Sequence, residues 1–207
     1  NYKNFQSVVD DLQGNVRTDG GPINSRKDGH IDSVLYGITG HATFTVRKGS
    51  GPYVWTATEQ LVIPSVSTSS SATVTFKGNN DTINYSGTAA KRAAIIMNGA
   101  DWFRFHSLNI YNLATTRAWS IQFKQQADDN MVNNCVIRTP NVTGATTSGV
   151  TGSVCVVFSD ADDVIQTQPV DQWGWVAVSS LAPNGSRNVF ENNSIGGNEG
   201  AGTGAGP

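Results

Sequence analysis

Two clusters of side chains in the second half of the chain could do chemistry. Asp160, Asp162 and Asp163 follow an apolar run, and Trp173 and Trp175 come later with one glycine between them. Converging carboxylates can hold a hard cation such as Ca²⁺, and tryptophans can stack on sugar rings. The alternatives are structural, because aspartates at loop starts are commonly solvated turn residues and tryptophans can pack a loop onto the domain beneath it. The sequence leaves open a metal site at the aspartates and a ligand site at the tryptophans.

A third cluster of polar side chains lies earlier in the sequence than these two clusters. Asp101, Arg104 and His106 surround one predicted strand, and Asp128 and Asp129 follow about one repeat later. Charged residues are the normal covering of a solvated sheet face. We therefore expect this group to be surface rather than a catalytic site.

A short repeated motif defines the elements that must position these candidates. It occurs at residues 105–110 (FHSLNI), 132–137 (VNNCVI) and 190–195 (FENNSI). The second copy starts 27 residues after the first, and the third starts 58 residues after the second, which suggests two periods with inserted loops. Periods of this length are typical of stacked repeats, in which no unit buries its own apolar face alone.

Strand patterns fill each period. Alternating or short apolar runs separated by bends of one or two residues favour a parallel β-helix over a sandwich, which would need regular hairpin turns. The predicted strands are residues 42–46, 53–56, 60–63, 73–76, 82–85, 94–97, 102–106, 108–111, 119–123, 131–133, 135–138, 154–158, 188–191 and 194–195.

Superimposing the copies predicts which side chains face the core. Apolar residues recur in columns, and we expect each column to point inward. These columns are Ile95, Ile121 and Val156, with Met97, Phe123 and Phe158, on the first strand of each coil; Phe105, Val132 and Phe190 on the second; and Ile110, Ile137 and Ile195 on the third.

The same alignment places Ser107, Asn134 and Asn192 at one bend. Side chains stacked at such a bend can hydrogen-bond from coil to coil and satisfy backbone groups that a tight corner leaves free. We expect a structural ladder there. The register also puts Cys135 inside and Cys155 outside, which predicts free thiols rather than a mutual disulfide.

The outward positions of the first strand decide between a scaffold and an enzyme. They contain one lysine and no carboxylate, whereas a Ca²⁺-dependent lyase or a two-acid glycosidase needs carboxylates that converge. The predicted outward residues are Ala94, Ile96, Asn98, Ser120, Gln122, Lys124, Cys155, Val157 and Ser159.

The N-terminal segment differs from the rest. Phe5, Val8, Val9 and Leu12 have helical spacing before Gly14, which predicts a short amphipathic helix that covers the end of the stack. We divide the chain into a cap region at residues 1–41, with this helix and a loop, and β-helix coils at residues 42–207. The fold class is therefore all-β, a right-handed parallel β-helix with a short capping helix.

Several segments resemble a module of large secreted proteins of the Bacteroidetes. They are residues 59–64 (EQLVIP), 72–88, 95–102 (IIMNGADW) and 133–138 (NNCVIR), with residues 4–12 matching the module's start. The resemblance implies a pectin-lyase-like right-handed β-helix exported across the outer membrane by the type IX secretion system, whose translocon components would be partners during export. Because the chain stops in mid-period, we expect it to be truncated at its C-terminal end.

Composition and charge disfavour some classes of protein. The net charge is −2 with no basic patch, which disfavours nucleic acid, and no apolar run reaches the roughly 18 residues of a membrane span. We expect no cofactor. The sequence favours a non-enzymatic protein that is extracellular or on the cell surface and acts as a stalk, adhesin or binding scaffold. A glycan is a candidate ligand. The alternative is a carbohydrate-active β-helix, a polysaccharide lyase or glycoside hydrolase, whose catalytic residues lie outside this chain.

Overall fold

Parallel strands make up nearly all of the regular structure. The computed structural model describes residues 2–22, 26–27, 36–114, 118–140, 153–160, 176–178 and 185–197. Three parallel sheets have five strands each. Sheet 1 contains β3 (Ala42–Thr45), β6 (Val74–Lys77), β9 (Phe103–His106), β12 (Met131–Asn133) and β16 (Val189–Glu191). Sheet 2 contains β4 (Tyr53–Thr56), β7 (Thr82–Ser86), β10 (Asn109–Asn112), β13 (Val136–Thr139) and β17 (Ser194–Gly197). Sheet 3 contains β5 (Leu61–Pro64), β8 (Ala93–Asn98), β11 (Trp119–Lys124), β14 (Val154–Phe158) and β15 (Val176–Val178).

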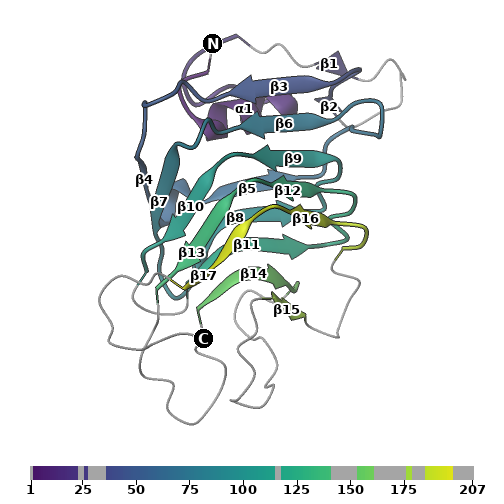
Figure 1. The fold of residues 1–207 in the computed structure, drawn as a ribbon. Coiled ribbons are helices and arrows are strands. Elements are labelled where there is room, and N and C mark those ends of the chain that lie inside the picture. Colours follow the sequence, from purple (N-terminus) through teal and green to yellow (C-terminus); the bar gives the residue numbers. More distant parts are fainter. Residues whose placement is uncertain are drawn as a thin grey trace.

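The chain visits the three sheets in turn and then begins the next coil. Thus β3, β4 and β5 form one coil, β6, β7 and β8 the next, and each strand pairs in parallel with its equivalent one coil away. Figure 1 shows these coils stacked below α1 and β3. The protein is a parallel β-solenoid, as the repeat predicts.

The register confirms the predicted inward columns. Val132 pairs with Phe105 on one side and with Phe190 on the other, and Ile137 lies between its two predicted neighbours in the same way. The expected two-period gap before the third motif copy is wrong. The third copy belongs to the coil directly after the second, because insertions lengthen the connection without adding a coil.

Aromatic rings fill the centre of the stack. Phe76 lies parallel to Phe105 on the next coil, with ring centroids 5.6 Å apart, and both side chains are almost completely buried. Burying a phenylalanine contributes about 1.5–3 kcal/mol relative to leaving it exposed. These rings therefore hold successive coils together from within.

Helix α1 (Phe5–Leu12) covers the first coil, as predicted. The Asn4 side chain accepts a hydrogen bond of 2.7 Å from the backbone N–H of Ser7, which caps the helix N-terminus. On the buried face, the Phe5 ring meets the edge of the Trp55 ring at 5.4 Å. The helix thus extends the aromatic core beyond the first coil at the N-terminal end of the stack.

The predicted orientation of three residues in sheet 3 is wrong. Ala94 and Cys155 belong to the central core, and the Ser120 hydroxyl donates a 2.8 Å hydrogen bond to the carbonyl oxygen of Arg138 in sheet 2. Simple alternation fails because these small residues lie where the chain turns from sheet 2 into sheet 3, so two consecutive residues face inward. Both cysteines are free, as expected, and both are buried, which raises the pKa of each thiol.

Some short elements lie where the sequence pattern is weak. Strand β15 adds to sheet 3 beside β14 before the chain returns to sheet 1. A short 3₁₀ helix spans Ala57–Glu59, and β1 (Arg26–Lys27) pairs antiparallel with β2 (Tyr36–Gly37). These elements span two or three residues each, too few to show a period.

Candidate functional site

Most of the predicted metal and ligand residues lie outside the described residues. This holds for Asp162, Asp163, Trp173 and Trp175. The carboxylate of Asp160 accepts a 2.5 Å hydrogen bond from the backbone N–H of Gln125 one coil away. Within the described ranges, no three His, Cys, Asp or Glu side chains gather where they could hold a metal ion.

The predicted ladder residues occupy equivalent bends. Ser107, Asn134 and Asn192 all have left-handed backbones, with φ of 51°, 52° and 53°. Asparagine tolerates this conformation better than most residues. The Asn134 amide approaches His106 Nε2 on the preceding coil at 3.5 Å and donates to the side chain of Asn133.

Stronger links between coils come from asparagines one residue before a strand. Asn130 accepts a 2.9 Å hydrogen bond from the N–H of Phe103 on the preceding coil and donates one of 2.8 Å to the carbonyl oxygen of Ala100. One amide therefore satisfies both a donor and an acceptor that the corner leaves free. The same pair of bonds is made by Asn188, to Asn130 N–H and Ala127 O, and by Asn193, to Cys135 N–H and Val132 O.

The acidic residues around β9 also connect coils. Asp101 accepts a 2.7 Å hydrogen bond from the N–H of Asp128, whose own carboxylate accepts from the N–H of Ser186. Burial, and secondarily the negative charges of Asp128 and Asp129, raise the pKa of Asp101. The hydrogen bonds and charge of Arg187 lower the pKa of Asp129. His106 lies at the far end of β9, so these groups do not form one site.

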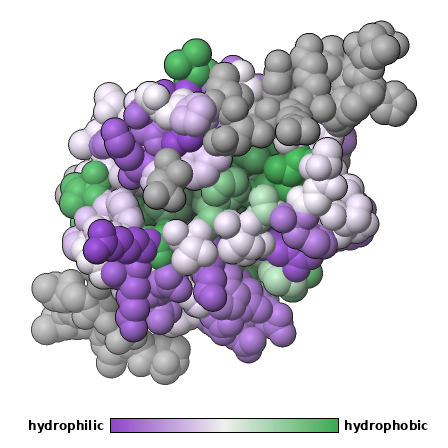
Figure 2. Space-filling view, turned by 90° about the horizontal axis from the view of Figure 1, so that it is seen from above, coloured by the Kyte–Doolittle hydropathy of each residue, from purple (hydrophilic) through white to green (hydrophobic). Residues whose placement is uncertain are grey.

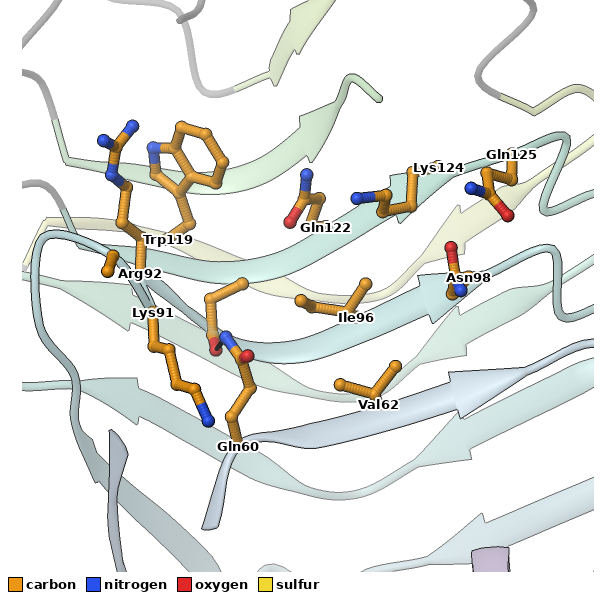
Figure 3. A pocket seen from close by; sticks show the side chains of 12 residues that line it. Gln60, Val62, Lys91, Arg92, Ile96, Asn98, Trp119, Gln122, Lys124 and Gln125 are labelled. Carbon is orange, nitrogen blue, oxygen red and sulfur yellow. Dashed lines mark hydrogen bonds between the residues drawn. The ribbon is translucent and has the colours of Figure 1, made fainter. Parts of the chain in front are cut away.

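The outer face of sheet 3 carries a groove of about 320 Å³. Its floor is apolar, since Val62 of β5 pairs in register with Ile96 of β8. Gln122 of β11 continues this row, as Figure 3 shows. Neighbouring strands lie about 4.8 Å apart, so the groove crosses three coils of a rigid sheet.

One end of the groove is a fixed wall. The guanidinium of Arg92 lies 5.3 Å from the centre of the Trp119 ring, and its Nε donates a 2.6 Å hydrogen bond to the carbonyl oxygen of Ala89. Arg92 and Trp119 are only 5% and 3% exposed. Trp119 is thus a buried wall rather than an open stacking platform. Exposed Lys91 lies at the same end.

The other end presents polar groups, where Asn98 and Lys124 are paired in register and Gln125 follows. Figure 3 shows the Asn98 amide between the strand and these two side chains. The Asn98 side-chain oxygen is buried and has no hydrogen-bond partner in the part of the chain that the structure describes. Buried polar atoms almost always have a partner. Among the described residues, this oxygen is therefore a buried acceptor without a donor, on a residue that lines the groove.

The charge of the groove limits its chemistry. Its described lining includes Lys91, Arg92 and Lys124 and contains no aspartate or glutamate. A two-acid glycosidase centre or a carboxylate Ca²⁺ site cannot be built from these residues. Four of the predicted outward residues, Ile96, Asn98, Gln122 and Lys124, do line this face. The sequence alignment located the face, but not the hollow in it.

Figure 2 views the N-terminal end of the stack from above, where polar side chains surround a central apolar area. This end is formed by α1 and the first coil, and its partly buried apolar residues, such as Phe44 and Tyr53, pack against the core. We therefore assign this apolar area to the cap rather than to a ligand site.

No helix among the described residues is both long and apolar enough to cross a bilayer. Comparisons of the chain with protein-family models, with curated proteins and with solved structures found no significant match.

Proposed function

We propose that this chain is a non-enzymatic β-solenoid segment of a secreted or cell-surface protein, and that it binds a glycan in the groove on sheet 3. The rigid parallel stack supports a scaffold role. The resemblance of residues 59–64, 72–88 and 133–138 to the Bacteroidetes module supports export across the outer membrane by the type IX secretion system.

The buried oxygen of Asn98, which has no hydrogen-bond partner within the described part of the chain, carries the glycan assignment. After a rotation of the side chain that exposes this oxygen, a sugar hydroxyl can donate to it, and the neighbouring amide of Gln125 and ammonium of Lys124 can serve other hydroxyl oxygens. The apolar floor of Val62 and Ile96 suits the C–H face of a sugar ring. A polyhydroxylated ligand matches this combination better than a purely apolar one.

Binding is tested by screening the purified chain on an array of plant and microbial polysaccharides, followed by calorimetry on the best binder. Asn98→Leu removes the acceptor at similar volume and should weaken binding about tenfold, the equivalent of about 1.4 kcal/mol. Asn84→Leu is the matched control, since Asn84 lies in β7 of sheet 2. Equal loss in both variants, or no binding of any polysaccharide by the unchanged chain, would contradict the glycan assignment.

Export is tested separately. The parent protein, expressed in a bacterium that has the type IX system, should reach the medium or cell surface, and deletion of the translocon should retain it inside the outer membrane. Export that is unaffected by this deletion would contradict the proposal.

The position of the groove supports one alternative. Lyases of the pectin-lyase-like fold place their chemistry on an outer sheet face, so this groove could be the carboxylate-free end of a longer substrate cleft. Asp or Glu residues that converge on the same face in further coils, together with polysaccharide cleavage by the longer protein, would favour this carbohydrate-active enzyme.

A further inference from the structure

Asn112, at the end of β10, lies beneath the wall of the groove but outside the groove itself. Its side chain is 1% exposed. Its amide nitrogen donates one hydrogen bond of 2.6 Å to the carbonyl oxygen of Arg92 and one of 2.5 Å to that of Trp119. Its oxygen accepts a 3.0 Å bond from the N–H of Ala114. All hydrogen-bonding groups of this amide are therefore in use.

The two carbonyls lie on neighbouring coils and one position apart in register, since Trp119 pairs with Ala93, the residue after Arg92. Arg92 immediately precedes β8 and Trp119 begins β11, and the N–H of Trp119 also donates to the Arg92 carbonyl at 3.1 Å. Asn112 thus fixes the distance between these strands where they start. The same two residues send their side chains to the outer face, where guanidinium and indole pack together.

This arrangement differs from the asparagines at the other corners. Asn130 bonds one N–H and one carbonyl oxygen of the preceding coil, whereas Asn112 donates to two carbonyls on two different coils. A buried amide with two such bonds resists displacement, because any shift leaves a buried carbonyl unpaired.

We propose that Asn112 is a positioning residue for the groove: acting through the backbone, it holds Arg92 and Trp119 in the packed pair that forms the groove's wall. It touches no ligand. The proposal concerns the groove described above, but its test requires no ligand, so it can fail or succeed independently of the glycan assignment.

The test uses the full chain labelled with 5-fluorotryptophan. Fluorine NMR gives a separate signal for each tryptophan, and Trp119→Phe identifies that of Trp119. In Asn112→Ala we expect the Trp119 signal to shift by more than its linewidth or to broaden, while the Trp55 signal stays in place. Asn130→Ala is the matched control, since Asn130 is equally buried and also bonds two backbone groups.

Both variants should lose stability, but only the change at Asn112 should move the Trp119 signal. An unmoved signal in folded Asn112→Ala, or equal shifts in both variants, would overturn the proposal. Asn112→Ser, which keeps one donor in a smaller side chain, is measured alongside in case the alanine variant does not fold. A Trp119 signal in folded Asn112→Ser that matches the unchanged protein would equally overturn it.

Discussion

The corner of sheet 1 and the groove of sheet 3 use similar polar residues in opposite ways. At the corner, the side chains of Asp101, Asp128 and Asn130 bond backbone groups of neighbouring coils. In the groove, the oxygen of Asn98 is buried, and no residue that the structure describes donates a hydrogen bond to it. The bends of the solenoid bring backbone groups that no ladder satisfies within reach of Asp101, Asp128 and Asn130, whereas no such group among the described residues donates to the oxygen of Asn98. The corner therefore holds the coils together, whereas the strand face is where we propose that a ligand binds.

The largest expected loss of stability comes from a substitution in the core, which lies beneath both regions. Phe105→Ala should lower the free energy of unfolding by about 3–5 kcal/mol, because it removes a fully buried ring that stacks on Phe76. Urea denaturation followed by circular dichroism measures the change. Val189→Ala, at an outward position that is 44% exposed, should change it by no more than about 0.5 kcal/mol. A similarly small loss for Phe105→Ala would show that the core register is wrong.

The next largest effect is a loss of stability at the corner that should leave binding in the groove unchanged. Asn130→Ala should cost about 2–3 kcal/mol, since it leaves the N–H of Phe103 and the carbonyl of Ala100 unpaired in the interior. The same denaturation experiment measures this loss, and binding of the glycan found on the array should be unchanged. A loss below about 0.5 kcal/mol would mean that the corner bonds do not hold the coils together.

A smaller, pH-dependent effect tests the charges at the corner. The pKa of Asp101 is higher in the folded than in the unfolded protein, so this group stabilises the fold below about pH 4, and the contribution is lost as the pH rises through its folded pKa. Asp101→Asn keeps an acceptor for the Asp128 N–H without this dependence. The variant should therefore gain stability relative to the unchanged protein as the pH rises from 4 to 7.

For Asp129→Asn we expect the opposite change of stability with pH. The pKa of Asp129 is lowered by Arg187, so its carboxylate stabilises the folded protein above the unfolded pKa and loses this effect in acid. The variant should be less stable than the unchanged protein near pH 7, and the difference should shrink toward pH 3. Thermal unfolding across this pH range measures both variants, and parallel pH profiles would contradict the assigned charges.

The smallest effect is expected in the groove. Asn98→Leu should change the free energy of unfolding by no more than about 0.5 kcal/mol, or increase it slightly, because the side-chain oxygen accepts no hydrogen bond from any described residue. Differential scanning calorimetry can resolve this. A loss as large as that of Asn130→Ala would show that Asn98 is a corner-like structural residue, and the comparison between the two regions would fail.

Much of the fold could be predicted because the repeat places equivalent residues in register. The columns at Phe105, Ile110 and Ile121 follow from aligning three motif copies, since a parallel stack puts equal positions directly above one another. Alternation alone mispredicted Cys155, because the chain bends where sheet 3 begins. Of the candidate site, the sequence could predict only the sheet face on which it lies. Ile96, Asn98 and Gln122 point outward in both the alignment and the structure.

The sequence by itself determined the solenoid, its capping helix and the absence of carboxylates from the predicted outer face of sheet 3, because these depend on residue type and period. Only the tertiary structure decided which polar groups are satisfied. The amide of Asn130 has two backbone partners and that of Asn112 bonds the carbonyls of two coils, whereas the oxygen of Asn98 has no partner in the ranges that the structure describes. Asparagine has the same hydrogen-bonding groups at all three positions. Its role depends on which backbone atoms the neighbouring coil brings within reach, and a one-dimensional pattern does not contain that information.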